Sequence, residues 1–321
     1  MVHSSGRITL WGIEAFIATA DEGSVSAAAR RLGVSPSGIS QQLAGLEAAL
    51  AAVLMDRSTR PVTLTPAGQM FRRRAQLILS EAQQAKAELA AQDLSALTDF
   101  RLGMIEDFDA DVTPRLLSAM AEELRTCQFL LETGASHRLF DLLDTRALDM
   151  VVAAEMGAAA DWMEVHPLLR EPFVAAVPKG RIDAAHDVLA QLQALPLIQY
   201  TLRHHMGRQI AEHLARQHLT LAHRFELDSY HAILAMVAGG AGWTILTPLG
   251  YLRAQRFRDQ VEILPLPFAP LSRTISLSAR AGVLQDMPVR VAAGLRPLLE
   301  EMIVTPAIAQ MPWLQGALRV L

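Results

Sequence analysis

A short polar run near the N-terminus carries the side chains best suited to contacting a nucleic acid. Ser37, Ser40, Gln41 and Gln42 fall within the first two turns of a helix that we predict from Pro36 onward. Serine hydroxyls can reach phosphates or base edges, and a glutamine amide can pair with adenine through two hydrogen bonds. A polar helix face is usually just solvated, so the run indicates DNA binding only together with the elements that position it.

Three short helices are predicted around this run. Apolar residues recur at helical spacing over residues 10–20 and predict the first helix. Ser24 can cap a second helix, and after a glycine turn Ser35 and Pro36 supply an N-cap and a first-position proline for the third. This order is the spacing of a helix-turn-helix unit, in which we expect Ser24, Ser35 and Pro36 to lie at the DNA-facing surface with the polar run.

A hairpin with two arginines is predicted next. Residues 54–56 and 62–64 have the pattern of short strands, so Arg57 and Arg60 are expected at the base and tip of a wing, where they could contact phosphates or the minor groove. Residues 23–74 hold seven arginines against two acids, although the chain as a whole carries a net charge of −4. A basic segment on an acidic body is typical of a DNA-binding head, and a chance cluster of solvated charges is the alternative.

A long helix is predicted after the wing. Thr65 and Pro66 provide its N-cap and first residue, and its apolar periodicity continues to about Leu94. A helix of this length with an apolar stripe needs a partner, so we expect a homodimer or a homotetramer. The arginines at 72–74 could reach the DNA backbone or could simply be solvated.

The N-terminal sequence resembles the head of LysR-type transcriptional regulators. The resemblance lies in GSVSAAARRLGVSPSGISQQLAGLE, residues 23–47, followed by LMDRSTRPVTLTPAG, residues 54–68. Two departures are Ala51, where a glycine is usual, and Met55, where a phenylalanine is usual. Both should adjust the wing rather than abolish it.

Strands and helices alternate from Phe100 onward, which predicts an α/β fold with a parallel sheet. The alternation resembles the two-lobed effector domain of the same family, which is similar to periplasmic solute-binding proteins. The expected fold class is therefore α/β, with a winged helix-turn-helix, a long linker helix and a two-lobed effector domain. We expect boundaries at 1–65 for the DNA-binding domain, 66–97 for the linker helix and 98–321 for the effector domain, with lobe 1 at about 98–167 and 270–321 and lobe 2 at about 168–269.

Polar residues beside the predicted strands are the candidates for an effector site, because such folds bind ligands where strand ends meet helix N-termini. The candidates are Glu106, Asp107, Ser136, His137, Tyr200, Thr201, Arg203 and Ser229. The resemblance implies hydroxyls that bind a carboxylate; Ser136 keeps that pattern, whereas Glu106 and Asp107 do not. An acidic lip would repel an anion, which favours a neutral or cationic effector, although these acids could equally complement the helix N-terminus at Thr113. Arg203 could still hold a carboxylate.

Other kinds of site find little support. The single cysteine, Cys127, excludes an intramolecular disulfide, and we expect an inert thiol within a buried strand rather than a redox sensor. The histidines between 204 and 231 lack metal-site spacing, and no catalytic motif is recognised, so we expect no metal, no cofactor and no enzyme. Glycines interrupt the uncharged run at 232–252, which predicts a buried helix and strand rather than a membrane span. No signal peptide is recognised, which favours the cytoplasm.

The sequence thus predicts a ligand-responsive transcription factor in which effector binding between the lobes alters promoter binding or bending. Its expected partners are double-stranded promoter or operator DNA, a small-molecule effector and further copies of itself, with RNA polymerase as an additional candidate. A two-lobed solute-binding or sensor protein without gene regulation is the alternative. The apolar tail, 303–321, is expected either to pack on the first lobe or to extend an oligomer contact.

Overall fold

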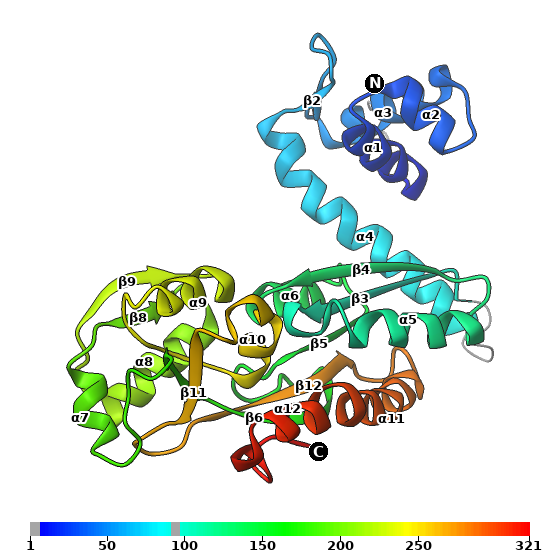
Figure 1. Cartoon of the computed structure of the whole chain (residues 1–321). Coiled ribbons are helices and arrows are strands. Elements are labelled where there is room, and N and C mark those ends of the chain that lie inside the picture. Colours follow the sequence, from blue (N-terminus) through cyan, green and yellow to red (C-terminus); the bar gives the residue numbers. More distant parts are fainter. Residues whose placement is uncertain (1–6, 91–96) are drawn as a thin grey trace. The chain divides into compact units, whose positions relative to one another are not determined.

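The computed structural model describes residues 7–90 and 97–321. Contacts divide the chain into two compact units, of which the first comprises Met1–Leu94 with Thr145–Ala147 and the second comprises Ser95–Asp144 with Leu148–Leu321. The N-terminal unit holds a helical head, a wing and a long helix, and the C-terminal unit holds two α/β lobes (Figure 1).

Three helices form the head: α1 (Leu10–Glu22), α2 (Val25–Arg31) and α3 (Pro36–Leu50). Both predicted caps are confirmed, because the Ser24 hydroxyl accepts a hydrogen bond from Ala27 N at 3.4 Å and the Ser35 hydroxyl accepts one from Gly38 N at 3.1 Å. Each cap satisfies an N–H group that the first helical turn leaves unpaired. The apolar helix faces meet in a buried cluster that includes Ile13, Phe16, Ile39, Leu43 and Leu46.

Helices α1 and α3 both end in a left-handed turn. Gly23 has φ 59° and Ala51 has φ 48°. Glycine adopts this conformation without a steric penalty, whereas the Cβ of alanine strains it. The alanine that replaces the usual glycine therefore keeps the turn but stores local strain.

The wing is a minimal hairpin. Strands β1 (Met55–Asp56) and β2 (Thr63–Leu64) pair antiparallel, with Met55 opposite Leu64. Met55 is buried in the core of the head, so the second departure from the family pattern also preserves packing. Helix α4 (Pro66–Ala90) begins at the predicted residue, and its predicted end near Leu94 lies outside the described residues.

Lobe 1 of the C-terminal unit is built on a six-stranded mixed sheet with the order β13-β6-β12-β5-β3-β4. Strand β3 is parallel to β4 and β5, as predicted, but β12 is antiparallel to β5 and β6, and β13 is antiparallel to β6. The parallel arrangement predicted from the first strands and helices is therefore confirmed, and the antiparallel strands are added where the chain returns from the second lobe to complete the first. The strands are β3 (Asp99–Ile105), β4 (Gln128–Gly134), β5 (Met150–Ala154), β6 (Met163–Pro172), β12 (Ser272–Arg280) and β13 (Arg319–Val320).

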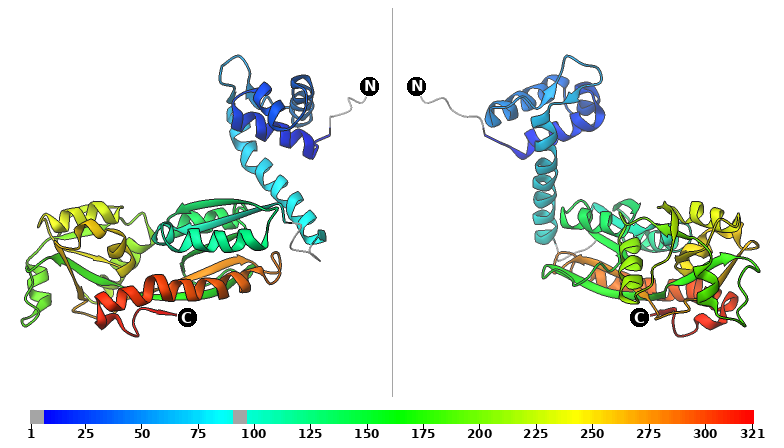
Figure 2. Two further views of the ribbon diagram at one scale, coloured as in Figure 1. Left: turned by 45° about the vertical axis from the view of Figure 1, so that its right-hand side comes forward. Right: turned by 90° about the vertical axis from the view of Figure 1, so that its left-hand side faces the viewer.

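Helices cover this sheet and the C-terminal tail completes it. Helix α11 packs on β6 and against α5, and α6 packs on β5 and β3 (Figure 2). The tail pairs β13 with β6 and buries Leu314 and Leu318, so it packs on the first lobe. The helical segments of lobe 1 are η2 (Glu106–Phe108), α5 (Val112–Glu123), α6 (Ser136–Asp144), α11 (Met287–Leu299), η4 (Glu300–Val304), α12 (Thr305–Gln310) and η5 (Pro312–Leu314).

Lobe 2 contains the sheet β10-β7-β11 and the parallel pair β8-β9, which an isolated bridge between Leu197 and Trp243 connects. The uncharged run forms a helix and a strand, α9 and β10, as predicted. No helix within the described ranges is long and apolar enough to cross a membrane. The elements are β7 (Val174–Pro178), α7 (Val188–Gln193), β8 (Leu197–Tyr200), α8 (His205–Arg216), β9 (His223–Leu227), α9 (Tyr230–Ala238), β10 (Thr244–Leu246), α10 (Pro248–Arg253), η3 (Gln255–Phe257) and β11 (Val261–Pro265).

Cys127 does not lie within a buried strand, which corrects the sequence prediction. It precedes β4, an edge strand that leaves Leu130 exposed, and its side chain is only partly buried. Burial, with Asp99 and Asp149 nearby, raises the pKa of the Cys127 thiol to about 11. The thiol is therefore protonated at neutral pH, and a protonated thiol is a poor nucleophile.

Candidate effector pocket and DNA-reading surface

A pocket lies between the two lobes of the C-terminal unit and encloses about 640 Å³ of space, part of it open to solvent. Lobe 1 contributes η2, the start of α6 and the start of β12 to its wall, and lobe 2 contributes the end of β8 and the starts of α8 and α9. Strand ends and helix N-termini therefore converge here, as the sequence predicted for this fold.

Five of the eight residues predicted for an effector site line this pocket. They are Glu106, Asp107, Ser136, His137 and Tyr200. Ser136 is the first residue of α6, and its hydroxyl accepts a hydrogen bond from Ala154 N on β5 at 3.1 Å. Tyr200 is the last residue of β8, and its hydroxyl donates to the backbone oxygen of Asp228 at 2.9 Å.

The structure places the other three predicted residues, Thr201, Arg203 and Ser229, outside the lining. The Thr201 hydroxyl donates to the Glu226 carboxylate at 2.7 Å, because successive residues at the end of a strand point to opposite sides. Arg203 is exposed, and Ser229 is exposed at the start of α9 without capping it. Direct contact between these three side chains and a ligand is therefore not supported.

Several lining residues escaped the sequence prediction. His204 and His205 begin α8, Asp228 and Tyr230 flank the start of α9, and Arg273 comes from β12. The histidines carried a weak signal in the sequence, since they lie four and five residues after Tyr200. No sequence signal pointed to Arg273, because it reaches the pocket only through the antiparallel pairing of β12 in the lobe 1 sheet.

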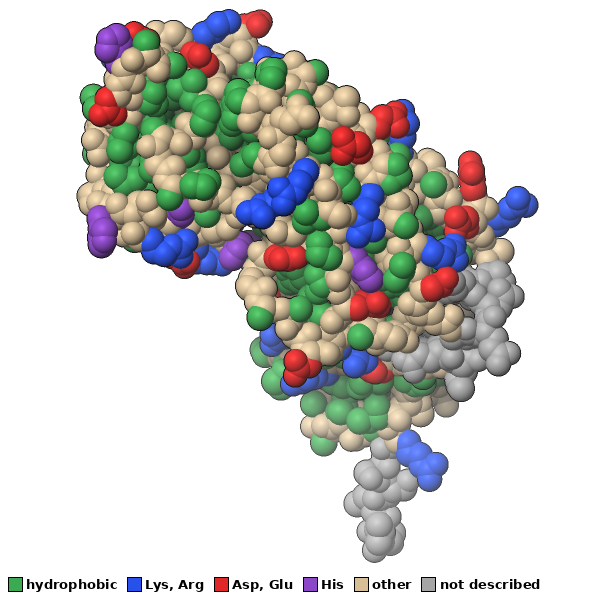
Figure 3. All heavy atoms as spheres, turned by 90° about the horizontal axis from the view of Figure 1, so that it is seen from below, with side chains coloured by type: hydrophobic (Ala, Val, Ile, Leu, Met, Phe, Trp, Pro, Cys, Tyr) green, Lys and Arg blue, Asp and Glu red, His purple; other side chains and the backbone are tan. Residues whose placement is uncertain are grey.

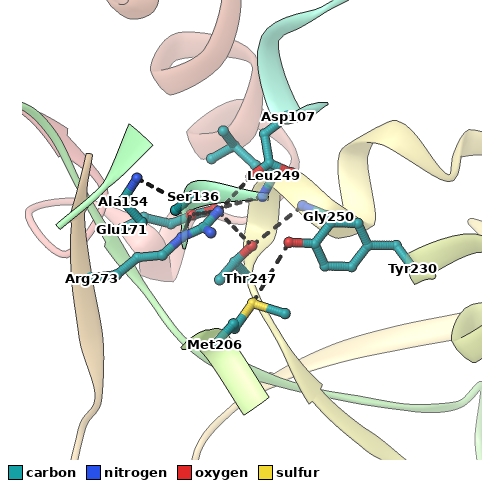
Figure 4. Close-up of polar contacts among 10 residues, drawn as sticks. All are labelled: Asp107, Ser136, Ala154, Glu171, Met206, Tyr230, Thr247, Leu249, Gly250 and Arg273. Carbon is teal, nitrogen blue, oxygen red and sulfur yellow. Dashed lines mark hydrogen bonds and ion pairs between the residues drawn. The ribbon is translucent and has the colours of Figure 1, made fainter. Parts of the chain in front are cut away.

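Arg273 is the centre of a buried ionic cluster (Figure 4). Its guanidinium donates to Asp107 Oδ2 and to Glu171 Oε2, both at 2.7 Å, and all three side chains are less than a tenth exposed. Glu171 Oε1 accepts from Leu249 N of α10 at 2.8 Å. Burial alone would lower the pKa of Arg273, but the two carboxylates outweigh it and raise that pKa. The cluster therefore joins lobe 1, through Asp107, to lobe 2, through Leu249.

Four rings follow one another along the pocket. The ring centroids of His137 and His204 are 5.4 Å apart, those of His204 and Tyr200 are 5.7 Å apart, and those of Tyr200 and Tyr230 are 5.6 Å apart. Burial, and then the neighbouring His137, lower the pKa of His204. Burial, and then Arg208, lower the pKa of His205. Burial therefore favours the neutral form of both imidazole rings.

No group of three or more histidine, cysteine or acidic side chains with metal-binding geometry occurs among the residues that the structure describes.

The acidic residues that follow β3 have two different roles. Glu106 and Asp107 line the pocket, whereas Asp109 pairs with Arg253 at 3.0 Å. On the face shown in Figure 3, cationic and anionic side chains are interspersed.

The polar run of the head lies on the first turns of α3. Ser37 and Gln41 are exposed, and Gln42 is partly exposed. The Ser40 hydroxyl donates to the Pro36 backbone oxygen at 3.0 Å, and it keeps an acceptor oxygen for a further contact. Ser24 and Ser35 act as caps here, so their roles in this structure are to begin α2 and α3.

The arginines of the head separate into paired and unpaired groups. Arg57 pairs with Glu47 at 2.6 Å, and Arg72 pairs with Asp21 at 2.7 Å. Within the described part of the head, Arg60 at the tip of the wing and Arg73 on α4 are exposed and have no acidic partner. Arg60 therefore keeps its full charge for a phosphate, whereas Arg57 must share its charge with Glu47.

A helix-turn-helix head with a wing, joined by a long helix to a two-lobed ligand-binding unit, defines a ligand-responsive regulator of transcription. The family described as the LysR substrate binding domain matches residues 97–295, and the family described as bacterial regulatory helix-turn-helix protein, lysR family, matches residues 10–69. The chain belongs to the LysR family of transcriptional regulators. The regulator interpretation is thereby supported over a solute-binding or sensor protein without gene regulation.

Relatives with regulatory names support this assignment. The chain is 31% identical over 291 residues, 89% of its length and 93% of the relative, to a probable hydrogen peroxide-inducible genes activator of Mycobacterium avium. It is 26% identical over 272 residues, 84% of its length and 88% of the relative, to the DNA-binding transcriptional dual regulator OxyR of Escherichia coli. These proteins are regulators rather than enzymes.

Solved structures share the fold. A full-length OxyR variant of Pseudomonas aeruginosa superimposes with a TM-score of 0.65 at 23% identity, over 91% of this chain and 95% of that one. A probable transcriptional regulator of the same organism gives a TM-score of 0.66 at 16% identity, over 92% and 97%.

Proposed function

We propose that this regulator binds a small-molecule effector in the pocket between its two lobes and that binding changes how its heads engage a promoter. The observation that supports the proposal is the position of Asp107. This residue lines the pocket and also pairs with Arg273, which is tied to lobe 2 through Glu171 and Leu249. A ligand that contacts Asp107 therefore acts directly on the group that links the lobes.

The effector site in this proposal consists of Glu106, Asp107, Ser136, His137 and Tyr200, joined by the lining residues that the sequence did not reveal. Thr201, Arg203 and Ser229 act only by shaping the backbone at the pocket edge. The proposed domains are residues 1–65 for DNA binding, 66–97 for the linker helix and 98–321 for the effector domain.

DNA contact is assigned to the exposed side chains of the head. Ser37, Gln41 and Gln42 read base edges from the start of α3, and Arg60 contacts phosphate or the minor groove. Ser24, Ser35 and Pro36 position α2 and α3 for this contact. Paired heads require a dimer or tetramer, for which α4 offers the exposed Met70 and Ile78. The protein then acts where its DNA is, in the cytoplasm, with RNA polymerase as a partner of the bound complex.

Peroxide sensing through a disulfide is not part of the proposal, although several relatives are named as hydrogen peroxide-inducible genes activators. The chain has one cysteine, which cannot form an intramolecular disulfide. Cys127 also lies outside the pocket lining, and its thiol has a raised pKa. Reversible, non-covalent binding of a ligand fits these residues better.

The test couples ligand binding to DNA binding. Compounds that raise the melting temperature of the full-length protein are added to a footprint on DNA upstream of its own gene. We expect the protected length or the DNA affinity to change with the compound, and this response to disappear in the variant Asp107→Asn. Stabilising compounds that leave the footprint and the DNA affinity unchanged would contradict the proposal.

A further inference from the structure

We propose that the effector of the interlobe pocket is a small organic ammonium ion, a protonated amine carried on an apolar or aromatic body. This inference rests on the proposed function of the pocket as an effector site and adds the chemical class of the ligand. Three independent properties of the pocket lead to it: its charge, its unsatisfied acceptors and its aromatic wall.

Charge is the first property. Glu106, Asp107 and Asp228 line the pocket, and the guanidinium among its lining residues is that of Arg273. Arg273 is already held at 2.7 Å by Asp107 and at 2.7 Å by Glu171, so it has little charge left for an anion. An anionic ligand would therefore meet net repulsion, and a cation would meet net attraction.

An unsatisfied acceptor is the second property. The Asp107 side chain is 5% exposed, and its Oδ1 has no hydrogen-bond partner among the described residues. A buried carboxylate oxygen without a donor is costly, and an N–H group of a ligand would satisfy it. The Tyr200 hydroxyl donates its hydrogen bond to the backbone oxygen of Asp228, so its oxygen also keeps lone pairs free to accept. Acceptors without donors match an ammonium group, which offers three N–H donors and no acceptor.

The aromatic wall is the third property. His137, His204, Tyr200 and Tyr230 present successive rings with centroid separations of 5.4, 5.7 and 5.6 Å. The faces of aromatic rings attract cations, most strongly where water is excluded, and they also pack well against an apolar body. Carboxylates beside aromatic faces favour a cation over a neutral molecule of the same shape.

Matched probes test the ligand class directly. Butyl, cyclohexyl and benzyl compounds, each as the ammonium, the alcohol and the carboxylate, are titrated calorimetrically into the full-length protein at neutral pH. We expect at least one ammonium to bind about tenfold more tightly than the alcohol and the carboxylate with the same body. Tighter binding of the alcohol or carboxylate overturns the inference but leaves the effector pocket standing. Absence of binding for all three classes overturns the effector pocket and the inference together.

Substitutions locate the binding group. Asp107→Asn keeps an oxygen for Arg273 and puts an N–H donor in place of the unpartnered Oδ1, so ammonium affinity should fall about tenfold while carboxylate affinity rises. A purely structural defect would weaken both. The matched control is Asp111→Asn, an exposed acid of the same segment outside the lining, which should change neither affinity. Equal effects of the two substitutions would contradict the inference.

A second variant makes the test independent of whether Asp107→Asn folds. Glu106 lines the pocket but is exposed, so Glu106→Gln removes a charge without disturbing the core. It should weaken ammonium binding several-fold. Unchanged ammonium affinity in this variant would count against a cationic effector.

Discussion

Arg273 and Glu171 are direct partners across the antiparallel strands β12 and β6, and their side chains form a buried ion pair with Nε 2.7 Å from Oε2. Strand β6 leads into lobe 2 just after Glu171, and β12 returns from lobe 2 just before Arg273. The pair therefore sits where both connections between the lobes pass. Asp107 connects this ion pair to the pocket, because its carboxylate binds the same guanidinium.

Breaking this cluster should destabilise the C-terminal unit. Arg273→Met leaves two carboxylates buried without their partner, which typically costs about 3–5 kcal/mol. Urea unfolding of the full-length protein measures the loss. The control Arg125→Met changes an exposed arginine and should stay within about 0.5 kcal/mol of the wild type. An equally small effect of Arg273→Met would show that the cluster does not hold the lobes.

Replacing Ala51 should stabilise the head. Ala51 has φ 48°, and Ala51→Gly relieves about 1 kcal/mol of left-handed strain. Thermal unfolding of the N-terminal unit, followed within the full-length protein, checks the gain. Ala44→Gly in the exposed middle of α3 is the control and should cost about 1 kcal/mol. Destabilisation by both substitutions would contradict the strain at Ala51.

The two arginines of the wing should contribute unequally to DNA affinity. Arg60→Ala is expected to weaken binding to all DNA sequences alike and to lower the slope of log affinity against log salt by about 1. Arg57→Ala should do less, because Glu47 already neutralises part of that charge. Affinity measured on one DNA at several salt concentrations separates the two. Identical effects would show that the Arg57–Glu47 pair opens on DNA.

Gln41→Ala should instead relax sequence preference. A bidentate base contact contributes about 1–3 kcal/mol of discrimination, so the variant should lose affinity for operator DNA but not for random DNA. Competition between the two DNAs gives the ratio directly. The exposed Ala48→Ser on the same helix is the control for surface changes. Equal losses on both DNAs for Gln41→Ala would exclude a base-reading role.

Acid should destabilise the C-terminal unit through its pocket histidines. Burial lowers the pKa of His204 and His205 below the ordinary value of 6.5, while Asp228 and Glu106 oppose the shift at His204, and Glu212 opposes it at His205. The unfolded chain then binds protons in a pH range where the folded chain does not. Stability is therefore fully present above about pH 6.5 and is lost as the pH falls from there toward the lowered pKa values.

Urea unfolding across that range measures the dependence. The double substitution His204→Gln and His205→Gln should flatten it, whereas His231→Gln, at an exposed position on α9, should leave it unchanged. A slope that persists in the double variant would assign the titration to other groups.

Local sequence signals predicted the head well. The caps Ser24 and Ser35, the first-position prolines and the apolar spacing of α1 and α3 all act within a few residues, so they can be read directly from the chain. Predictions failed where pairing is long-range. Arg273 and Glu171 meet only through the antiparallel pairing of β12 with β6, which lie about a hundred residues apart in the chain, so local patterns could place neither residue.

The pocket residues also divide into those that the sequence predicted correctly and those that it did not. Glu106, Asp107, Ser136, His137 and Tyr200 follow strands or begin helices, and fold geometry alone brings them to one place. Thr201 was expected beside Tyr200 in the pocket, but the alternation of side chains at a strand end turns it to Glu226. That choice depends on which face of β8 is buried, and a strand of only four residues has too little alternation to reveal this from the sequence.

Sequence-specific DNA binding by the whole protein is the most direct test of this account. Full-length protein is footprinted on DNA upstream of its own gene, with unrelated DNA as competitor and with salt varied. We expect two protected half-sites that survive the competitor and weaken steeply with salt. Weak protection that ignores sequence at every salt concentration would contradict it.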